Sequence, residues 1–262
     1  MQLSMTRLEA ALLLSVAAAA LLACLGPAAP QYVNYHAFAD QRAAWGLPHG
    51  MDVLSNLPFA VGGIWGLVTL YRQGFVPGVR HSLALLFFAG LVLAAIGSSI
   101  YHWQPDDTRL AYDRLGMVAA FAGLLGMATA DRMSERAGVL VAQTVLLWGP
   151  LSIAVWATSA NLLPWAVLQG GGMLLVLWLA CCRPLEGAWG LSLWTVIAVY
   201  TLAKLLELGD HQVFMWTGGM LSGHSLKHVA AACAAWPVGA ALQTATRPVH
   251  NGKLAEGPAP RT

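Results

Sequence analysis

The sequence predicts an all-α integral membrane protein, with a core of seven transmembrane helices and one additional transmembrane helix at the N-terminus. Of its 262 residues, 58% are hydrophobic and only 10% are charged, whereas a typical soluble domain is about 25% charged. The hydrophobic residues also fall into eight runs of membrane-spanning length. A net charge of +2 is too small to favour nucleic-acid binding, and no protein partner is predicted.

The eight runs are separated by polar segments and by turn-forming residues such as Pro77-Gly78, Pro105 and Arg183-Pro184. They cover residues 8–28, 51–71, 82–103, 110–130, 137–157, 161–182, 188–206 and 221–243. The chain therefore divides into four parts. These are an N-terminal transmembrane helix or signal anchor (1–30), an amphipathic connector (31–50), a seven-helix core (51–245) and a disordered tail (246–262).

The first run has features of both a signal peptide and a retained helix. Arg7 precedes a core rich in Ala and Leu, as in a signal peptide. The sequence Ala28-Ala29-Pro30, however, lacks a clean small-x-small cleavage site. We therefore expect a retained helix.

Basic residues in the loops predict the orientation in the membrane. Cytoplasmic loops carry the excess of Lys and Arg. The loops on one side hold Arg72, Arg80, Arg132, Arg136 and Arg183, and the tail on that side holds Arg247, Lys253 and Arg261. The opposite loops hold little beyond Arg42 and Arg109. Both termini are therefore expected in the cytoplasm, with the protein in an inner or plasma membrane.

Two polar motifs lie in or beside the apolar runs. In the first, Ser98 and His102 are four residues apart and share a helix face, and Asp113 lies about one turn inside the next run. In the second, His224 and His228 also share a helix face. The predicted orientation brings both motifs to the outer side of the membrane. Ionisable groups at such positions are costly and usually functional.

Three histidines from two helices are the ligand set of a catalytic zinc site, with His102, His224 and His228 as the metal ligands. Zinc lowers the pKa of a bound water to near 7. Asp113 would transfer protons, and Ser98 would donate a hydrogen bond to the developing oxyanion. The alternative interpretation is structural: each histidine merely bonds a backbone carbonyl between helices.

These residues resemble a known group of enzymes. Ser-x-x-x-His, an Asp eleven residues further on and His-x-x-x-His near the C-terminus are similar to the motif of the alkaline ceramidase family. That family belongs to the CREST superfamily of membrane hydrolases, with the adiponectin and progestin receptors as relatives. The resemblance covers roughly residues 49–243, and Ser55-Asn56 also resembles a family position in the first core helix.

The resemblance implies a zinc-dependent hydrolase that cuts the amide bond of ceramide or a related N-acyl lipid, giving a sphingoid base and a fatty acid. The three histidines would be its zinc ligands. In the animal enzymes, acidic calcium ligands lie just before the first core helix. Here that region offers only Asp40 and Asp52, and His49 stands about where a glutamate is expected. A calcium site is therefore doubtful.

Two other functions compete with the hydrolase. A receptor-like or lipid-binding protein with a structural zinc would keep the histidines but would not need Asp113 and Ser98. A transporter would be expected to show broken helices and internal repeats at mid-membrane, and the sequence shows neither. Among the remaining polar residues, Lys204 and Glu207 are expected to form a structural pair across one helix turn.

Overall fold

The computed structural model describes residues 5–74 and 78–245, and over these residues its regular secondary structure is helical. Six helices are long and apolar enough, by length and composition, to cross a membrane. They cover residues 7–25, 50–72, 79–103, 107–132, 135–159 and 163–180. The predicted all-α membrane fold is confirmed at this level. The predicted disordered tail, residues 246–262, lies outside the described residues.

The helix bounds follow the eight apolar runs closely. The elements are α1 (Arg7–Leu25), α2 (Gly50–Leu54), α3 (Leu57–Arg72), α4 (Val79–Trp103), α5 (Asp107–Arg132), α6 (Glu135–Ser159), α7 (Leu163–Ala180), α8 (Leu193–Leu208), α9 (Asp210–Trp216), α10 (Gly223–Ala232) and α11 (Ala235–Ala245). Every predicted run is therefore helical, but the last two runs do not meet the length criterion for a span.

The last two predicted runs fall short of spanning length for different reasons. The run predicted at 188–206 begins as a helix only at Leu193, which leaves α8 with 16 residues. The run predicted at 221–243 is interrupted between α10 and α11. Pro237 lies in the first turn of α11, and its missing N–H cannot continue the hydrogen bonding of a preceding helix. The predicted count of seven core spans plus one is therefore reached only in part.

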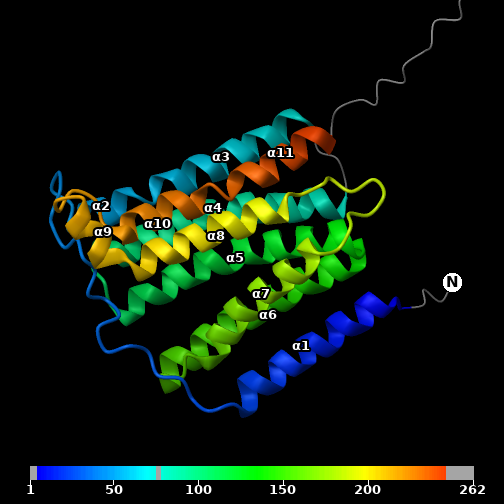
Figure 1. Ribbon diagram of the computed structural model, residues 1–262, viewed down its shortest axis with the longest axis horizontal. Coiled ribbons are helices and arrows are strands. Elements are labelled where there is room, and N and C mark those ends of the chain that lie inside the picture. Colours follow the sequence, from blue (N-terminus) through cyan, green and yellow to red (C-terminus); the bar gives the residue numbers. More distant parts are fainter. Residues whose placement is uncertain (1–4, 75–77, 246–262) are drawn as a thin grey trace, which may run out of the picture.

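The helices form a bundle in which α4 and α5 pack against each other along their length (Figure 1). Helices α10 and α11 follow one another alongside α3, and α8 lies next to α10. The end of α4, the starts of α5 and α10, and the short helices α2 and α9 all lie at one end of the bundle. This end, called the site end below, carries both predicted motifs.

Glycines allow the backbones of α4 and α5 to approach closely. A Cβ atom on Gly116 of α5 would lie 2.6 Å from the Cα of Ala94. A Cβ atom on Gly97 of α4 would collide with the Tyr112 carbonyl oxygen and lie 3.3 Å from the Cα of Asp113. Small residues at such contacts are typical of helix packing in membranes. Gly97 therefore sets the distance between the Ser98 and Asp113 segments.

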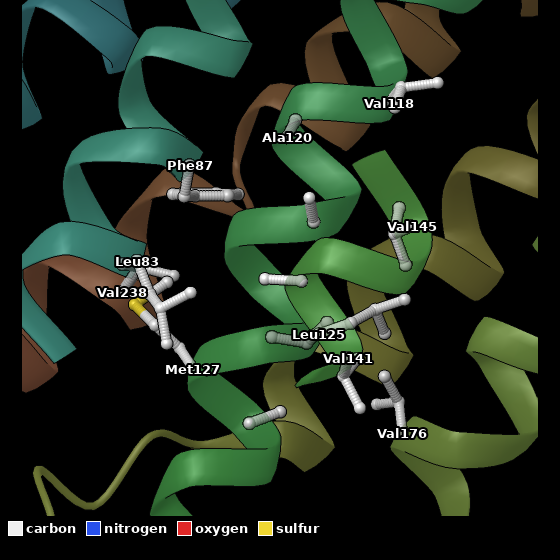
Figure 2. Close-up of a cluster of buried hydrophobic side chains, with 14 of the residues drawn as sticks. Leu83, Phe87, Val118, Ala120, Leu125, Met127, Val141, Val145, Val176 and Val238 are labelled. Atoms are coloured by element: carbon white, nitrogen blue, oxygen red, sulfur yellow. The ribbon is translucent and has the colours of Figure 1, made fainter. Parts of the chain in front are cut away.

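The apolar core lies between α4 and α5 and extends to α6, α7 and α11. Figure 2 shows part of it, with labelled side chains from these five helices. They are Leu83, Phe87, Val118, Ala120, Leu125, Met127, Val141, Val145, Val176 and Val238. All are less than a tenth exposed.

Helix α1 lies at the edge of the bundle and packs against α7 (Figure 1). Near its start, the Glu9 carboxylate accepts hydrogen bonds from the Arg136 guanidinium and the Ser134 hydroxyl, both at 2.7 Å. Beyond its end, the Ala29 N–H donates to the Asn161 side chain at 3.0 Å. Between these contacts lies an apolar groove of about 820 Å³, lined by α1, α6 and α7.

Candidate metal centre

Three buried histidine side chains from α4 and α10 meet at the site end. Candidate ligand atoms of His102, His224 and His228 all lie within 4.8 Å of one another. The ring centroids are 4.7 Å apart for His102 and His224, 5.1 Å for His102 and His228, and 4.8 Å for His224 and His228. The i, i+4 spacing in α10 presents two of the rings to the third, as the motif predicted.

The separation of the ring nitrogens fits a tetrahedral metal. The Nε2 atoms of His102 and His224 are 3.1 Å apart. Two nitrogens bound to one tetrahedral zinc at about 2.0–2.1 Å would be about 3.3 Å apart. These three residues can therefore hold a metal ion, and their nitrogen chemistry suits zinc.

The orientation of His228 is fixed from α2. Its Nδ1 lies 2.8 Å from the Ser55 hydroxyl oxygen, and that hydroxyl donates to the Asp52 carbonyl at 2.8 Å. Because a serine has a single hydroxyl proton, its oxygen must accept from Nδ1–H of His228. The Nε2 atom of His228 is then unprotonated in the neutral ring and free to bind a metal. Such partners of ligating histidines orient the ring and raise its basicity.

Helix α10 and the connector are fixed to the centre by a buried carboxylate. Asp210 accepts a hydrogen bond from the His224 backbone N–H at 2.8 Å and another from the Ala39 N–H at 2.9 Å. The connector thereby places Phe38 over two of the histidines, with ring centroids 4.9 Å from His102 and 4.2 Å from His224. The apolar ring excludes water from that side of the cluster.

Asp52 lies in the same region but has only half of its carboxylate satisfied. Its Oδ1 atom accepts hydrogen bonds from the hydroxyls of Ser225 at 2.6 Å and Ser222 at 3.3 Å. Its Oδ2 atom is buried without a partner, and the residue is fully inaccessible. In the connector, Asp40 is engaged by the Arg42 guanidinium at 2.7 and 2.8 Å. This ion pair keeps the pKa of Asp40 below its usual value. The interpretation of these acids as unsuited to calcium stays a prediction.

Ser98 and Asp113 face a cavity next to the histidines. The cavity has a volume of about 230 Å³, and Ser98, Asp113 and His228 are among its lining residues. The Asp113 carboxyl also interacts with the Ser98 hydroxyl. The predicted serine, aspartate and histidines therefore come together, with an accessible space beside them.

Two lysines and a glutamate also line this cavity. Glu207 of α8 accepts from Lys227 at 2.6 Å and is also paired with Lys204. The expected pair of Lys204 and Glu207 is thus confirmed. The sequence did not predict that Lys227 would join it, because the interaction links α10 to the neighbouring helix α8.

Several supporting residues were not predicted. Phe38 approaches from the connector, whose path over the site end has no simple signal in the sequence. Asp210 holds the backbone of α10 although it follows α8 in the chain. Ser55 was noted only for its family resemblance, and its contact with His228 depends on how α2 packs against α10.

No family model matches the sequence, and no curated protein matches it.

Proposed function

We propose that the protein is a zinc-dependent intramembrane hydrolase that cuts the amide bond of a ceramide-like or related N-acyl lipid. One observation carries the proposal. A cavity beside three converging histidines is lined by a serine and an aspartate that interact with each other. A structural metal site would need the histidines but not an open space shared with a hydroxyl and a carboxyl group.

Amide hydrolysis requires activation of water, stabilisation of charge on the carbonyl oxygen and protonation of the leaving nitrogen. Zinc held by His102, His224 and His228 would supply Lewis acidity and lower the pKa of water. Asp113 takes a proton from the attacking water and later delivers one to the leaving nitrogen. Ser98 donates a hydrogen bond to the carbonyl oxygen as it gains charge.

The membrane arrangement proposed with this function has seven core spans, one N-terminal span and both termini in the cytoplasm. Helices α8, α10 and α11 are each shorter than a membrane span, with 16, 10 and 11 residues. However, α10 and α11 pack along α3, and α8 packs against α10. The basic loop residues support a cytoplasmic location for the end opposite the site. Reporter fusions at the C-terminus and in the α8–α10 loop test this orientation, and an external C-terminus would overturn it.

Metal analysis tests the ligand set. Purified wild-type protein is expected to contain one zinc per chain, and His224→Ala and His228→Ala protein should lose most of it. His211→Ala is the matched control, because His211 is exposed and bonds only the Ala37 carbonyl. Zinc retained at the wild-type level in both cluster variants would contradict the assignment.

Turnover of ceramide and related lipid amides tests the chemistry. Asp113→Asn should lower the rate by about 10²–10⁴, the range for a general acid–base. Ser98→Ala should lower it by about 10²–10³, as for one oxyanion donor. Zinc content should stay unchanged in both.

The controls for these variants are Asp107→Asn on α5 and Ser82→Ala on α4. Asp107 is exposed, and the Ser82 hydroxyl bonds a backbone carbonyl in its own helix. Full activity of zinc-loaded Asp113→Asn would refute the mechanism. A wild-type protein that binds zinc but cuts no lipid amide would favour the receptor-like alternative.

A further inference from the structure

The cavity contains a buried cation whose hydrogen-bond donors are mostly unused. Arg114 follows Asp113 in α5, is only 2% exposed and lines the cavity. Its Nη2 donates to the Gln31 side chain at 3.1 Å, whereas Nε and Nη1 have no hydrogen-bond partner. These two atoms carry three of the five N–H donors of the guanidinium. Arg114 is therefore a buried charge that the described part of the chain leaves largely unsatisfied.

The nearby acids are occupied elsewhere. Asp106 caps α5 and pairs with Arg109, and Asp107 bonds His36 and Gln31. Within residues 5–74 and 78–245, no carboxylate lies within ion-pair distance of the Arg114 guanidinium.

Three aromatic rings lie close to the guanidinium. Its central carbon lies 4.0 Å from the Trp156 ring centroid, with Trp165 at 5.6 Å and Tyr35 at 5.8 Å. Cation–π contacts of this kind stabilise the charge through the ring face. The N–H donors point outward in the guanidinium plane, and this fork matches the paired oxygens of a carboxylate or phosphate.

The other charged residues around the cavity already have partners or a proposed function, which leaves Arg114 as the group that can bind an anion. Lys204 and Lys227 are both engaged by Glu207, and Asp113 is needed for proton transfer in the proposed reaction. The lining residues thus include three cations and two carboxylates, with one positive charge in excess. A ligand carrying one negative charge would balance them.

We propose that Arg114 binds an anionic oxygen group on the polar part of the substrate, so that the preferred lipid amide carries a carboxylate or phosphate headgroup. This inference rests on the proposed hydrolase function and narrows its substrate class. The lipid amide would lie with its headgroup at Arg114 and its amide bond near Ser98 and Asp113, which line the same cavity.

Equilibrium binding in lipid nanodiscs tests the proposal without requiring turnover. The probes are N-oleoylglycine, its phosphate-bearing counterpart N-oleoyl-phosphoethanolamine, neutral N-oleoylethanolamine and free oleate. At least one anionic amide should bind about 10- to 100-fold more tightly than the neutral amide, as expected for hydrogen bonds to a charged group. Whichever of the two binds more tightly identifies the headgroup. The measurement is made in the Ser98→Ala background, in which hydrolysis is expected to be slow and the charges around Arg114 are unchanged.

Arg114→Met should abolish this preference, and Arg114→Lys should retain only part of it because the fork is lost. Arg109→Met is the matched control on the same helix, since Arg109 pairs with Asp106 outside the cavity. Without ligand, Arg114→Met should retain zinc and unfold at a temperature no lower than the wild type, because it removes an unpaired buried charge.

Three results would overturn the inference. They are equal affinity for neutral and anionic amides, oleate binding as tightly as the anionic amides, and marked destabilisation with zinc loss in both Arg114→Met and Arg114→Lys. The second would assign the site to a free fatty acid, and the third would make Arg114 a structural residue. Loss of hydrolysis with the binding preference intact would instead count against the proposed function alone.

Discussion

The two ends of the α4–α5 pair both bury charged groups, but they satisfy them differently. At the end opposite the site, the Asp131 carboxylate accepts from the backbone N–H groups of Trp189 and Leu191 at 2.8 and 2.9 Å, and from the Arg132 guanidinium at 2.8 Å. At the site end, the Oδ2 atom of Asp52 has no partner. One carboxylate is saturated by the chain, and the other is not.

The cations show the same difference. Arg80 and Arg132 each keep an Nε atom without a hydrogen-bond partner, but both also donate to a carboxylate. Arg114 donates to an amide alone. Because buried polar groups in native proteins are nearly always paired, a buried guanidinium that lines a cavity and donates to no carboxylate is a candidate for ligand binding. The saturated cluster around Asp131 instead holds the α7–α8 loop against α5.

A matched pair of substitutions should give the largest contrast between the ends. Asp131→Asn removes the charge opposite Arg132 and should destabilise the protein by about 3–5 kcal/mol, the usual cost of breaking a buried ion pair. Asp52→Asn removes a buried charge that forms no ion pair in the described structure, and its Oδ1 can still accept from Ser225. It should change stability by no more than about 1 kcal/mol. Denaturation in detergent micelles measures both.

Glu135→Gln is the control for the Asp131 result, because this partner of Arg80 is half exposed and exposed pairs contribute about 0–1 kcal/mol. Equal losses for Asp131→Asn and Asp52→Asn would show that pairing does not distinguish the two ends.

A smaller effect is expected at the histidines themselves. Ser55→Ala removes the acceptor for the Nδ1–H group of His228 and should weaken zinc binding by about 10- to 100-fold, the usual cost of losing such a partner. Ser55→Thr retains the hydroxyl and should restore most of the affinity. Titration against a chelator of known affinity measures the change. Unaltered affinity in Ser55→Ala would mean that His228 is oriented by packing alone.

The parts of the site that could be predicted from the sequence are those set by helical periodicity. His224 and His228 share a helix face whatever the tertiary structure, and Ser98 and His102 do so for the same reason. The turn at Pro105 then places Asp113 beside them. Contacts made by Phe38 and Asp210 depend on the path of irregular chain, which no periodic pattern encodes.

Helix lengths and ion pairs were predicted less well than helix positions. Hydrophobicity marked the run 221–243 but did not register the break that divides α10 from α11, although Pro237 was visible. Sequence proximity also does not identify the ion pairs: Asp106 and Asp107 lie close to Arg114 in the chain, but in the described structure neither forms an ion pair with it. Asp106 is the N-cap of α5, and N-cap chemistry favours a bond to the backbone two or three residues on.

The smallest expected effect concerns Asp40, a carboxylate that lies at the site end but forms an ion pair. It tests whether pairing, and not location in the bundle, decides how much a buried carboxylate stabilises the protein. Asp40 is buried and held by Arg42, whose side chain is 54% exposed. The Arg42 hydrogen bonds lower the pKa of Asp40, so the pair stabilises the folded protein above the unfolded pKa of about 3.9. That stability is lost as the pH falls through the lower folded pKa. Solvent screening limits the contribution to about 1 kcal/mol or less.

Thermal unfolding of wild type and Asp40→Asn should therefore differ slightly at pH 7, and the difference should shrink towards pH 3. A difference that is independent of pH would mean that Asp40 acts through packing, and that the charge pairing which distinguishes Asp131 from Asp52 has no counterpart in the connector.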